Sequence, residues 1–270
     1  MKNYAGPTDI MYHTGLSADM IRGAKYALVP GDPGRVEGLA KSLDENALFV
    51  ASHRDYTTWL AQVENAPVLV MSTGMGGPCV TFAVEELARL GVETFIRVGT
   101  TGSIQEDLNL GDVVINTASV RMDGASRAYA PIEFPAVADP DTVLALREAA
   151  EESGIPFKTG ISISTDSFWP GQERYDSFGG YVLKRLQGSL EDFRHIGCTN
   201  YEMENATLFT LCSVLGLKAA SICGVVAKRT DSESVAPHEV YEKAEQRFQD
   251  VVKRALKKMI ARSRSGGNIS

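Results

Sequence analysis

Two glycine-containing segments of the sequence combine backbone amides with arginine in a way that suits an oxyanion. Arg97 ends an apolar run and precedes the run 99–102 (GTTG), which offers hydroxyl groups, several N–H donors and room for close approach. The expected strand 94–98 ends at GTTG, which would be a tight turn if Arg97 made only a surface ion pair. The segment 30–35 (PGDPGR) places Gly31 and Arg35 at an expected helix N-terminus. Amides and guanidinium groups in such positions bind phosphate. Taken alone, each segment also fits a surface ion pair or a solvated helix residue.

Other familiar motifs are absent from the sequence. The run 74–77 (GMGG) does not continue to G-x-G-x-x-G, because Cys79 stands at the third glycine position, and no G-K-[ST] occurs. The four cysteines and four histidines form no C-x-x-C or H-x-x-x-H pair, so we expect reduced thiols and no metal site. No Ser-His-Asp or Cys-His set stands out, which argues against a covalent enzyme intermediate.

Length and composition limit the class of protein. A chain of 270 residues with 44% hydrophobic and 23% charged residues predicts one globular domain over residues 1–270. A net charge of -7 and a pI of about 5.2 argue against nucleic acid or an anionic membrane as partner. The sequence has no apolar run of membrane-spanning or signal-peptide length, which favours a cytoplasmic location.

The segments that must position these residues alternate between expected strands and helices. Apolar runs indicate strands at 25–30, 47–51, 56–63, 67–72, 94–98, 112–117, 119–122, 158–164 and 218–227. The second, third and fourth of these suggest central strands. Caps and helical spacing indicate helices at 33–43, 79–90, 141–153, 204–215 and from 237 onward. The run 189–192 (SLED) resembles a capping box and predicts a further short helix.

The alternation of strands and helices predicts an α/β fold, in which ligands collect where strands end and loops begin. The stretch 167–180 is rich in glycine, proline and aromatic residues and predicts a long loop of the kind that often carries function. The polar stretch 262–270 predicts a frayed tail.

Five segments, in order along the chain, resemble the motif set of bacterial uridine phosphorylases, a branch of the nucleoside phosphorylase family. They are 30–35 (PGDPGR), 52–59 (SHRDYTTW), 97–102 (RVGTTG), 168–175 (FWPGQERY) and 200–207 (NYEMENAT), within a similarity that runs from residue 12 to residue 261. The resemblance implies the nucleoside phosphorylase fold, with a central mixed, twisted and partly barrel-like sheet flanked by helices. It also implies a homo-hexamer built as a trimer of dimers. The implied reaction, part of pyrimidine salvage, converts uridine, or deoxyuridine in its place, and inorganic phosphate to uracil and the sugar 1-phosphate.

The resemblance assigns residues to phosphate and to ribose. The implied phosphate ligands are Gly31, Arg35, Arg54, Arg97 and Thr100. Arginine suits this task because its planar fork can hold two phosphate oxygens and stays charged. The implied ribose ligands are His13, Glu202, Met203 and Glu204. Glu204 would accept hydrogen bonds from two sugar hydroxyls, although without the resemblance it reads as a glutamate favoured at a helix start. Arg54 and His13 are implied to act across the dimer interface.

The resemblance also assigns a set of base-binding residues: Thr101, Gly102, Phe168, Gln172, Arg174 and Arg229. Uracil presents an acceptor, a donor and an acceptor along one edge, which Gln172 and Arg174 can match. Phe168 would border the ring, and Arg229 would donate through water. The implied catalytic residues are Arg97, which orients phosphate, and the Gln172–Arg174 pair, which stabilises negative charge on the departing base.

Three alternative functions remain open at this point. A purine nucleoside phosphorylase of the same fold would carry an aspartate after a serine late in the chain, where this sequence has 226–229 (VAKR). A hydrolytic nucleosidase would need a base where the phosphate arginines stand. A non-catalytic nucleoside-binding protein would not need the phosphate residues.

The sequence departs from the family pattern at a few positions. Family members often hold a monovalent cation through a glutamate and a serine where this chain has Asp55 and Cys79. A thiol is a poor ligand for a hard ion, so a potassium site is doubtful and we expect no other cofactor. Lys228 and Trp169 also differ from the residues expected there, with no predicted direction of effect on the choice among uridine, deoxyuridine and thymidine.

Overall fold

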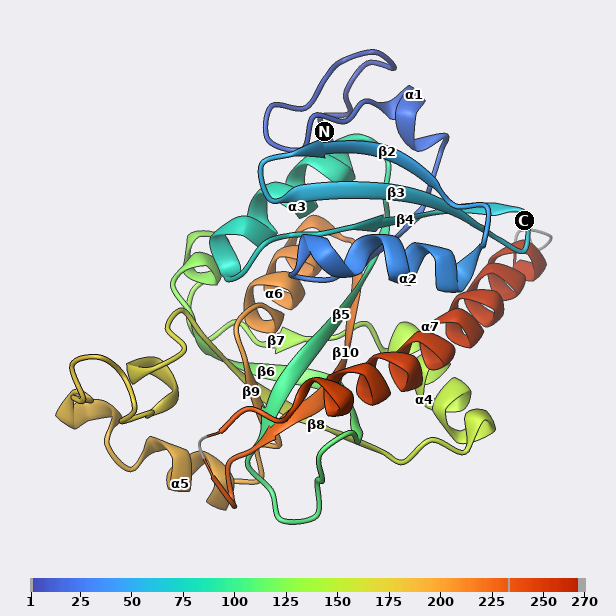
Figure 1. Ribbon diagram of the computed structural model, residues 1–270. Coiled ribbons are helices and arrows are strands. Elements are labelled where there is room, and N and C mark those ends of the chain that lie inside the picture. Colours follow the sequence, from blue (N-terminus) through green and yellow to red (C-terminus); the bar gives the residue numbers. More distant parts are fainter. Residues whose placement is uncertain (1, 233, 267–270) are drawn as a thin grey trace.

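The computed structural model, which describes residues 2–232 and 234–266, is built around one mixed sheet (Figure 1). Its strands are β1 (Tyr26–Val29), β2 (Leu48–His53), β3 (Tyr56–Val63), β4 (Ala66–Met71), β5 (Thr94–Ser103), β6 (Val113–Met122), β7 (Ala136–Val137), β8 (Phe157–Thr165), β9 (Asn200–Glu202) and β10 (Lys218–Lys228). The hydrogen-bonded order is β10-β6-β8-β9-β5-β1-β4-β3-β2, with β7 paired to β6.

One part of this sheet closes on itself. β10 pairs with β5 in parallel and with β6 in antiparallel orientation. From β6 the ring continues in parallel through β8 to β9, and β9 returns antiparallel to β5. These five strands form a closed ring, from which β1, β4, β3 and β2 extend as an open sheet. The mixed, partly barrel-like sheet expected of the nucleoside phosphorylase fold is confirmed.

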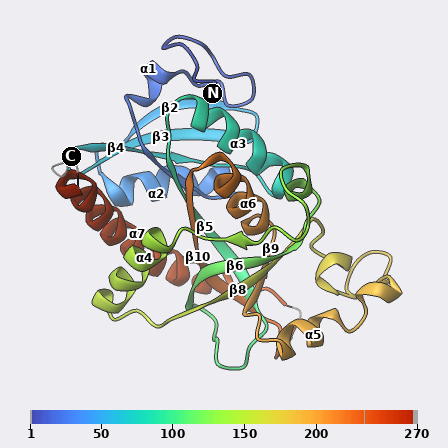
Figure 2. The same cartoon turned by 180° about the vertical axis from the view of Figure 1, so that it is seen from behind.

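Helices cover both faces of the sheet. They are α1 (Ala18–Ile21), α2 (Val36–Leu43), α3 (Gly77–Arg89), α4 (Pro140–Ser153), α5 (Ser189–His195), α6 (Asn205–Leu215) and α7 (His238–Gly266). Side chains alternate along β1, so that Leu28 packs in a cluster with α2, α4 and α7, whereas Ala27 and Val29 pack in a second cluster with α3 and α6 (Figure 2). β1 is thereby buried on both faces, as a central strand should be. None of the helices in the described residues has the length and apolar character needed to cross a membrane.

The segment 99–102 belongs to β5, whereas the predicted strand ended at Val98. β5 continues to Ser103 because residues 99–103 pair with residues 223–228 of β10, and 102–103 also pair with β9. Neither Gly99 nor Gly102 has a positive φ. Backbone conformation therefore does not require glycine at either position. At position 99 the requirement comes from the lack of space for a side chain beside Arg97.

Three further predictions were wrong in detail. The N-cap of α5 is Gly188, not Ser189, and the backbone N–H groups of Gly188 and Leu190 donate to the distant Glu173 at 2.5 and 2.7 Å instead of to a local capping box. α7 continues to Gly266, so residues 262–266 are helical where a frayed tail was expected, and 267–270 lie outside the described residues. β2 lies at the edge of the sheet rather than at its centre.

Candidate active site

A cavity of about 240 Å³ lies at the carboxyl ends of the parallel strands β1, β5 and β10. It brings together most of the residues that the sequence singled out: Gly31, Arg35, Arg97, Thr100, Thr101, Gly102, Phe168, Gln172, Arg174, Glu202, Met203 and Glu204. Asp32, Met75, Gly99, Tyr201, Val226, Ala227, Val235 and Tyr241 complete its lining. A larger hollow of about 1250 Å³ lies at the opposite ends of these strands but contains none of the predicted site residues.

Arg97 is a buried cation in the cavity lining, and the absence of a side chain at Gly99 leaves space for its guanidinium. A Cβ atom at position 99 would lie 1.7 Å from Arg97 Nη1 and 2.6 Å from Cζ. No residue with a side chain can therefore stand at 99 while Arg97 keeps this position. Gly31 is a second point of close approach, since a Cβ there would lie 3.2 Å from the carbonyl oxygen of Gly74.

Two carboxylates hold the Arg97 guanidinium. Its Nη2 donates to Glu204 Oε2, and its Nε lies 3.5 Å from Glu202 Oε2. Burial on its own would lower the pKa of Arg97, but the charges of Glu204 and Glu202 raise it above its ordinary value. The other oxygen of Glu204 accepts a hydrogen bond from the Gly76 amide at 2.7 Å. Arg97 is therefore a permanent cation in the cavity, and Glu204 is held in place from both sides.

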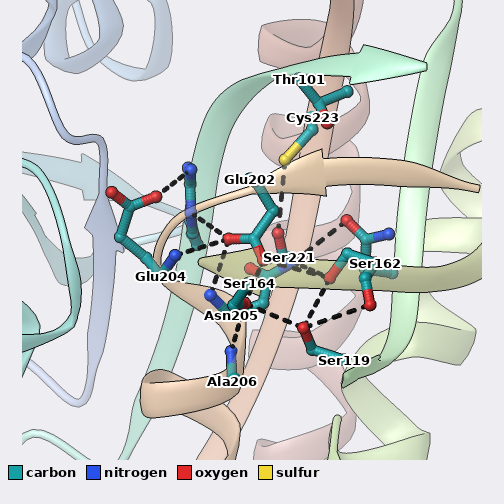
Figure 3. A network of polar contacts seen from close by, with 12 residues as sticks. Thr101, Ser119, Ser162, Ser164, Glu202, Glu204, Asn205, Ala206, Ser221 and Cys223 are labelled. Carbon is teal, nitrogen blue, oxygen red and sulfur yellow. Dashed lines mark hydrogen bonds and ion pairs between the residues drawn. The ribbon is translucent and has the colours of Figure 1, made fainter. Parts of the chain in front are cut away.

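Glu202 organises the backbone beside Glu204 (Figure 3). Its Oε2 accepts hydrogen bonds from the amides of Glu204 and Asn205, each at 2.7 Å, at the start of α6. Its Oε1 accepts from Ser162 Oγ at 3.2 Å and from Ser164 Oγ. Burial raises the pKa of Glu202 against the lowering influence of Arg97. Both oxygens already serve the chain itself, so the predicted contact of Glu202 with ribose stays a prediction and its visible role is to position Glu204.

The polar network behind Glu202 was not predicted. It continues from Ser162 and Ser164 to Ser119 at 2.8–2.9 Å, and Asn205 Nδ2 donates to Ser162 Oγ at 3.0 Å (Figure 3). All of these side chains are buried. The sequence feature that could have predicted this network is the alternation of serine with isoleucine in 161–164 (ISIS). It places two hydroxyls on one face of a buried strand.

The long loop 167–180 carries Phe168, Gln172 and Arg174, the residues predicted to bind the base, into the cavity lining. Gln172 and Arg174 are only 3% and 2% exposed, and the guanidinium of Arg174 lies 4.3 Å from the centre of the Phe168 ring. Arg174 Nε donates to Gln172 Oε1 at 3.4 Å. Arg229 does not line the cavity, but its Nη1 donates to the carbonyl oxygen of Gln172 at 2.6 Å. Arg229 thus holds the loop from the end of β10, and its predicted water-mediated contact with the base stays a prediction.

Arg35 enters the cavity from the start of α2 and pairs with Glu245 of α7. Its guanidinium also lies 5.2 Å from the centre of the Phe248 ring. Tyr241, one helical turn before Glu245, lines the same cavity, and burial raises its pKa despite the charge of Arg35. The sequence analysis missed this contribution of α7, because helical spacing alone does not show which strand ends a helix approaches.

His13 and Arg54 lie together on the surface and outside the cavity lining. His13 Nδ1 lies 2.7 Å from Glu86 Oε1, and its ring stacks on Phe82 with ring centres 4.0 Å apart. Although burial would raise the pKa of Glu86, hydrogen bonds from His13 and its neighbour lower it. Arg54 is exposed and lies over the ring of Tyr12 at 4.9 Å. One chain alone therefore does not bring these two residues to its own cavity.

The two residues that depart from the family pattern at the expected cation position, Asp55 and Cys79, both lie close to Gly74. Burial raises the pKa of the Cys79 thiol, which therefore stays protonated and is unsuited to a hard cation. Within residues 2–232 and 234–266, no three His, Cys, Asp or Glu side chains gather as metal ligands do. Lys228 Nζ donates to Asn109 Oδ1 at 3.1 Å, Trp169 is 48% exposed, and neither residue lines the cavity.

Comparison with known proteins agrees with this geometry. The family model of the Phosphorylase superfamily matches residues 25–257. A uridine phosphorylase of Escherichia coli (strain K12) is 51% identical over 223 residues, which cover 83% of this chain and 88% of that protein. One of Thermococcus kodakarensis is 46% identical over 210 residues, 78% of this chain and 75% of that protein. A guanosine phosphorylase of Halorubrum lacusprofundi is more distant, at 37% identity over 201 residues, 74% of this chain and 77% of that protein.

The matched range includes every residue that lines the cavity, from Gly31 to Tyr241. The chain therefore belongs to the phosphorylase superfamily and, within it, to the uridine phosphorylase family.

Proposed function

We propose that this chain cleaves the N-glycosidic bond of uridine with inorganic phosphate and releases uracil and ribose 1-phosphate. One observation supports this proposal most strongly. Buried Arg97, which is suited to bind phosphate, and the Gln172–Arg174 pair, which can match uracil, line the same cavity. The relatives named uridine phosphorylase support the same substrate.

Phosphate would occupy the part of the cavity lined by Gly31, Arg35, Arg97 and Thr100. In the free chain Arg97 pairs with Glu204, and Arg35 pairs with Glu245. An incoming phosphate dianion offers each guanidinium a stronger charged partner and displaces the carboxylates. Glu204 Oε2 then becomes available to the ribose hydroxyls, while its other oxygen stays fixed by the Gly76 amide.

Catalysis follows from this arrangement. Cleavage builds positive charge on the sugar and negative charge on the base, so phosphate is placed beneath the sugar while Gln172 and Arg174 stabilise the departing uracil. Met203 lines the same cavity and would pack on the sugar. The chain needs no covalent intermediate and, in this proposal, no metal or organic cofactor.

The alternatives fit the cavity less well. Val226 and Ala227 line it where a purine-cleaving member would carry a carboxylate to protonate the base. A hydrolytic enzyme would need a general base to activate water, whereas Arg35 and Arg97 are cations. A binding protein without catalytic activity would have no use for these cations beside the sugar site.

The direct test is to incubate the purified protein with uridine, deoxyuridine, cytidine or guanosine, each with and without phosphate. We expect uracil from uridine only when phosphate is present, and no comparable release from cytidine or guanosine. Equal cleavage without phosphate would support the hydrolytic alternative, and preferential release of guanine would support the purine alternative.

We also propose that the active form is an oligomer, with a hexamer made of three dimers as the complete assembly and the cytoplasm as its location. His53 Nδ1 lies 2.8 Å from the carbonyl oxygen of His13 and so ties the two surface segments that carry His13 and Arg54. Exposed Tyr12 and Phe82 surround them. This apolar and cationic patch is suited to lie against a neighbouring chain and to complete its cavity.

The Gly99→Ala variant tests the phosphate site. The added methyl group would occupy the position of Arg97 Nη1, the flexible end of a side chain, so the chain should fold while Arg97 is displaced. We expect the KM for phosphate to rise about tenfold or more through loss of a charge-assisted contact. The matched control is Gly38→Ala, where a Cβ meets no atom within 4 Å. Unchanged phosphate kinetics in Gly99→Ala would contradict the assignment of Arg97.

The Arg54→Ala and Gln172→Ala variants together test the contribution from a neighbouring chain. Each variant alone should be nearly inactive. In co-expressed mixtures, one site of every mixed dimer would combine an intact Gln172 with an intact Arg54, so about a quarter of the sites should recover activity. Assays of the mixed sample, with its size measured by light scattering, check this outcome. No recovery in a properly mixed oligomer would mean that Arg54 acts within its own chain.

A further inference from the structure

Glu173 lies between the two uracil-matching residues but does not line the cavity. Its carboxylate instead closes the N-terminus of α5. Oε1 accepts a hydrogen bond from the Gly188 amide at 2.5 Å, and Oε2 accepts from the Leu190 amide at 2.7 Å. Ser189 Oγ donates to Oε2 at 3.3 Å, and Tyr175 Oη donates to Oε1 at 3.2 Å. The carboxylate replaces the missing local cap of a helix whose N-cap residue is a glycine.

α5 is held independently of Glu173, because its apolar side packs on the closed ring and its carboxyl end is bonded to Gln105, which follows β5. Leu190 and Phe193 pack on the buried cluster that contains Ile163 and Tyr201. At the carboxyl end, Gln105 Nε2 donates to the carbonyl oxygens of Arg194 and Cys198 at 3.1 and 2.7 Å. Figures 1 and 2 show α5 beside the end of the ring, with the long loop extending outward from it.

The backbone at Glu173 is in the left-handed region, with φ 53° and ψ 46°. Such a conformation is unfavourable for a residue with a side chain and persists only where surrounding contacts hold it. Arg174 N donates to the carbonyl oxygen of Trp169 at 2.8 Å, which closes the turn. This turn directs Gln172 and Arg174 into the cavity, where each is almost fully buried, and directs the carboxylate between them toward α5.

We propose that Glu173 is the positioning residue for base recognition. Its carboxylate fastens the Gln172–Arg174 turn to α5, while Arg229 holds the carbonyl oxygen of Gln172 from the end of β10. The turn is thus fixed from two sides before the base enters, which lowers the cost of ordering it on binding. The inference rests on the proposed function, since it names what orients the residues that read uracil.

The test uses the full chain with Glu173→Gln, in which an amide nitrogen replaces one carboxylate oxygen and cannot accept a hydrogen bond from α5. We expect the KM for uridine to rise about tenfold, with a smaller preference for uridine over cytidine, through loss of a charge-assisted hydrogen bond. The KM for phosphate should stay within about twofold, because Glu173 does not line the cavity and its carboxylate is bonded to α5. Hydrogen exchange at the amides of Gly188 and Leu190 should become faster.

Two further variants control for general loss of structure. Glu191→Gln changes an exposed carboxylate on the same helix and should leave all of these quantities unchanged. Glu173→Gly removes the carboxylate but relieves the left-handed backbone, so it should fold and still raise the KM for uridine.

An unchanged KM for uridine in both Glu173 variants, or an equal rise in the KM for phosphate, would overturn the positioning role. Absence of phosphate-dependent uridine cleavage by the unchanged chain would instead overturn the proposed function, so the two failures are distinguishable.

Discussion

A buried guanidinium held between two carboxylates is the interaction on which the rest of this cavity depends. Placing Arg97, Glu202 and Glu204 out of contact with bulk water is costly unless each charge finds partners. The partners are present: the Gly76 amide on Glu204, and two amides and two serine hydroxyls on Glu202. The start of α6, the residues facing it on β8 and the small residue at 99 are all constrained by this cluster of charges.

The cavity joins two kinds of support. The phosphate and ribose region is built on the closed ring, where β5 and β9 are paired on both sides and the polar network lies behind them. The base region is built on a loop, which gains its fixed shape from Arg229 on one side and from α5 on the other. The sugar and phosphate, which all nucleoside substrates share, would bind to the rigid region, whereas the base would bind to the loop. This arrangement lets one fold serve different nucleosides.

Much of the site could be predicted from sequence because its residues fall in short, ordered motifs. Arg97, Glu204, Gln172 and Arg174 were predicted and lie together in one cavity. The strands and helices were also predicted closely, since their apolar periodicity is strong.

What was missed depends on contacts between distant segments. Gly99 reads as a turn residue in sequence, yet it is required because the side chain of Arg97 folds over it. The capping box at 189–192 was plausible locally, but the α5 amides find a carboxylate 15 and 17 residues earlier in the chain. Glu245 reaches Arg35 only because α7 packs beside α2. No local pattern carries such information, because each contact is decided by the packing of the whole sheet.

In the proposed reaction, phosphate and not water takes the place of the base on the sugar. Phosphorus NMR of the unchanged protein with uridine and inorganic phosphate tests this most directly. We expect a new sugar 1-phosphate signal that grows in step with released uracil while the phosphate signal falls by the same amount. Release of uracil with free ribose and an unchanged phosphate signal would contradict the proposed reaction.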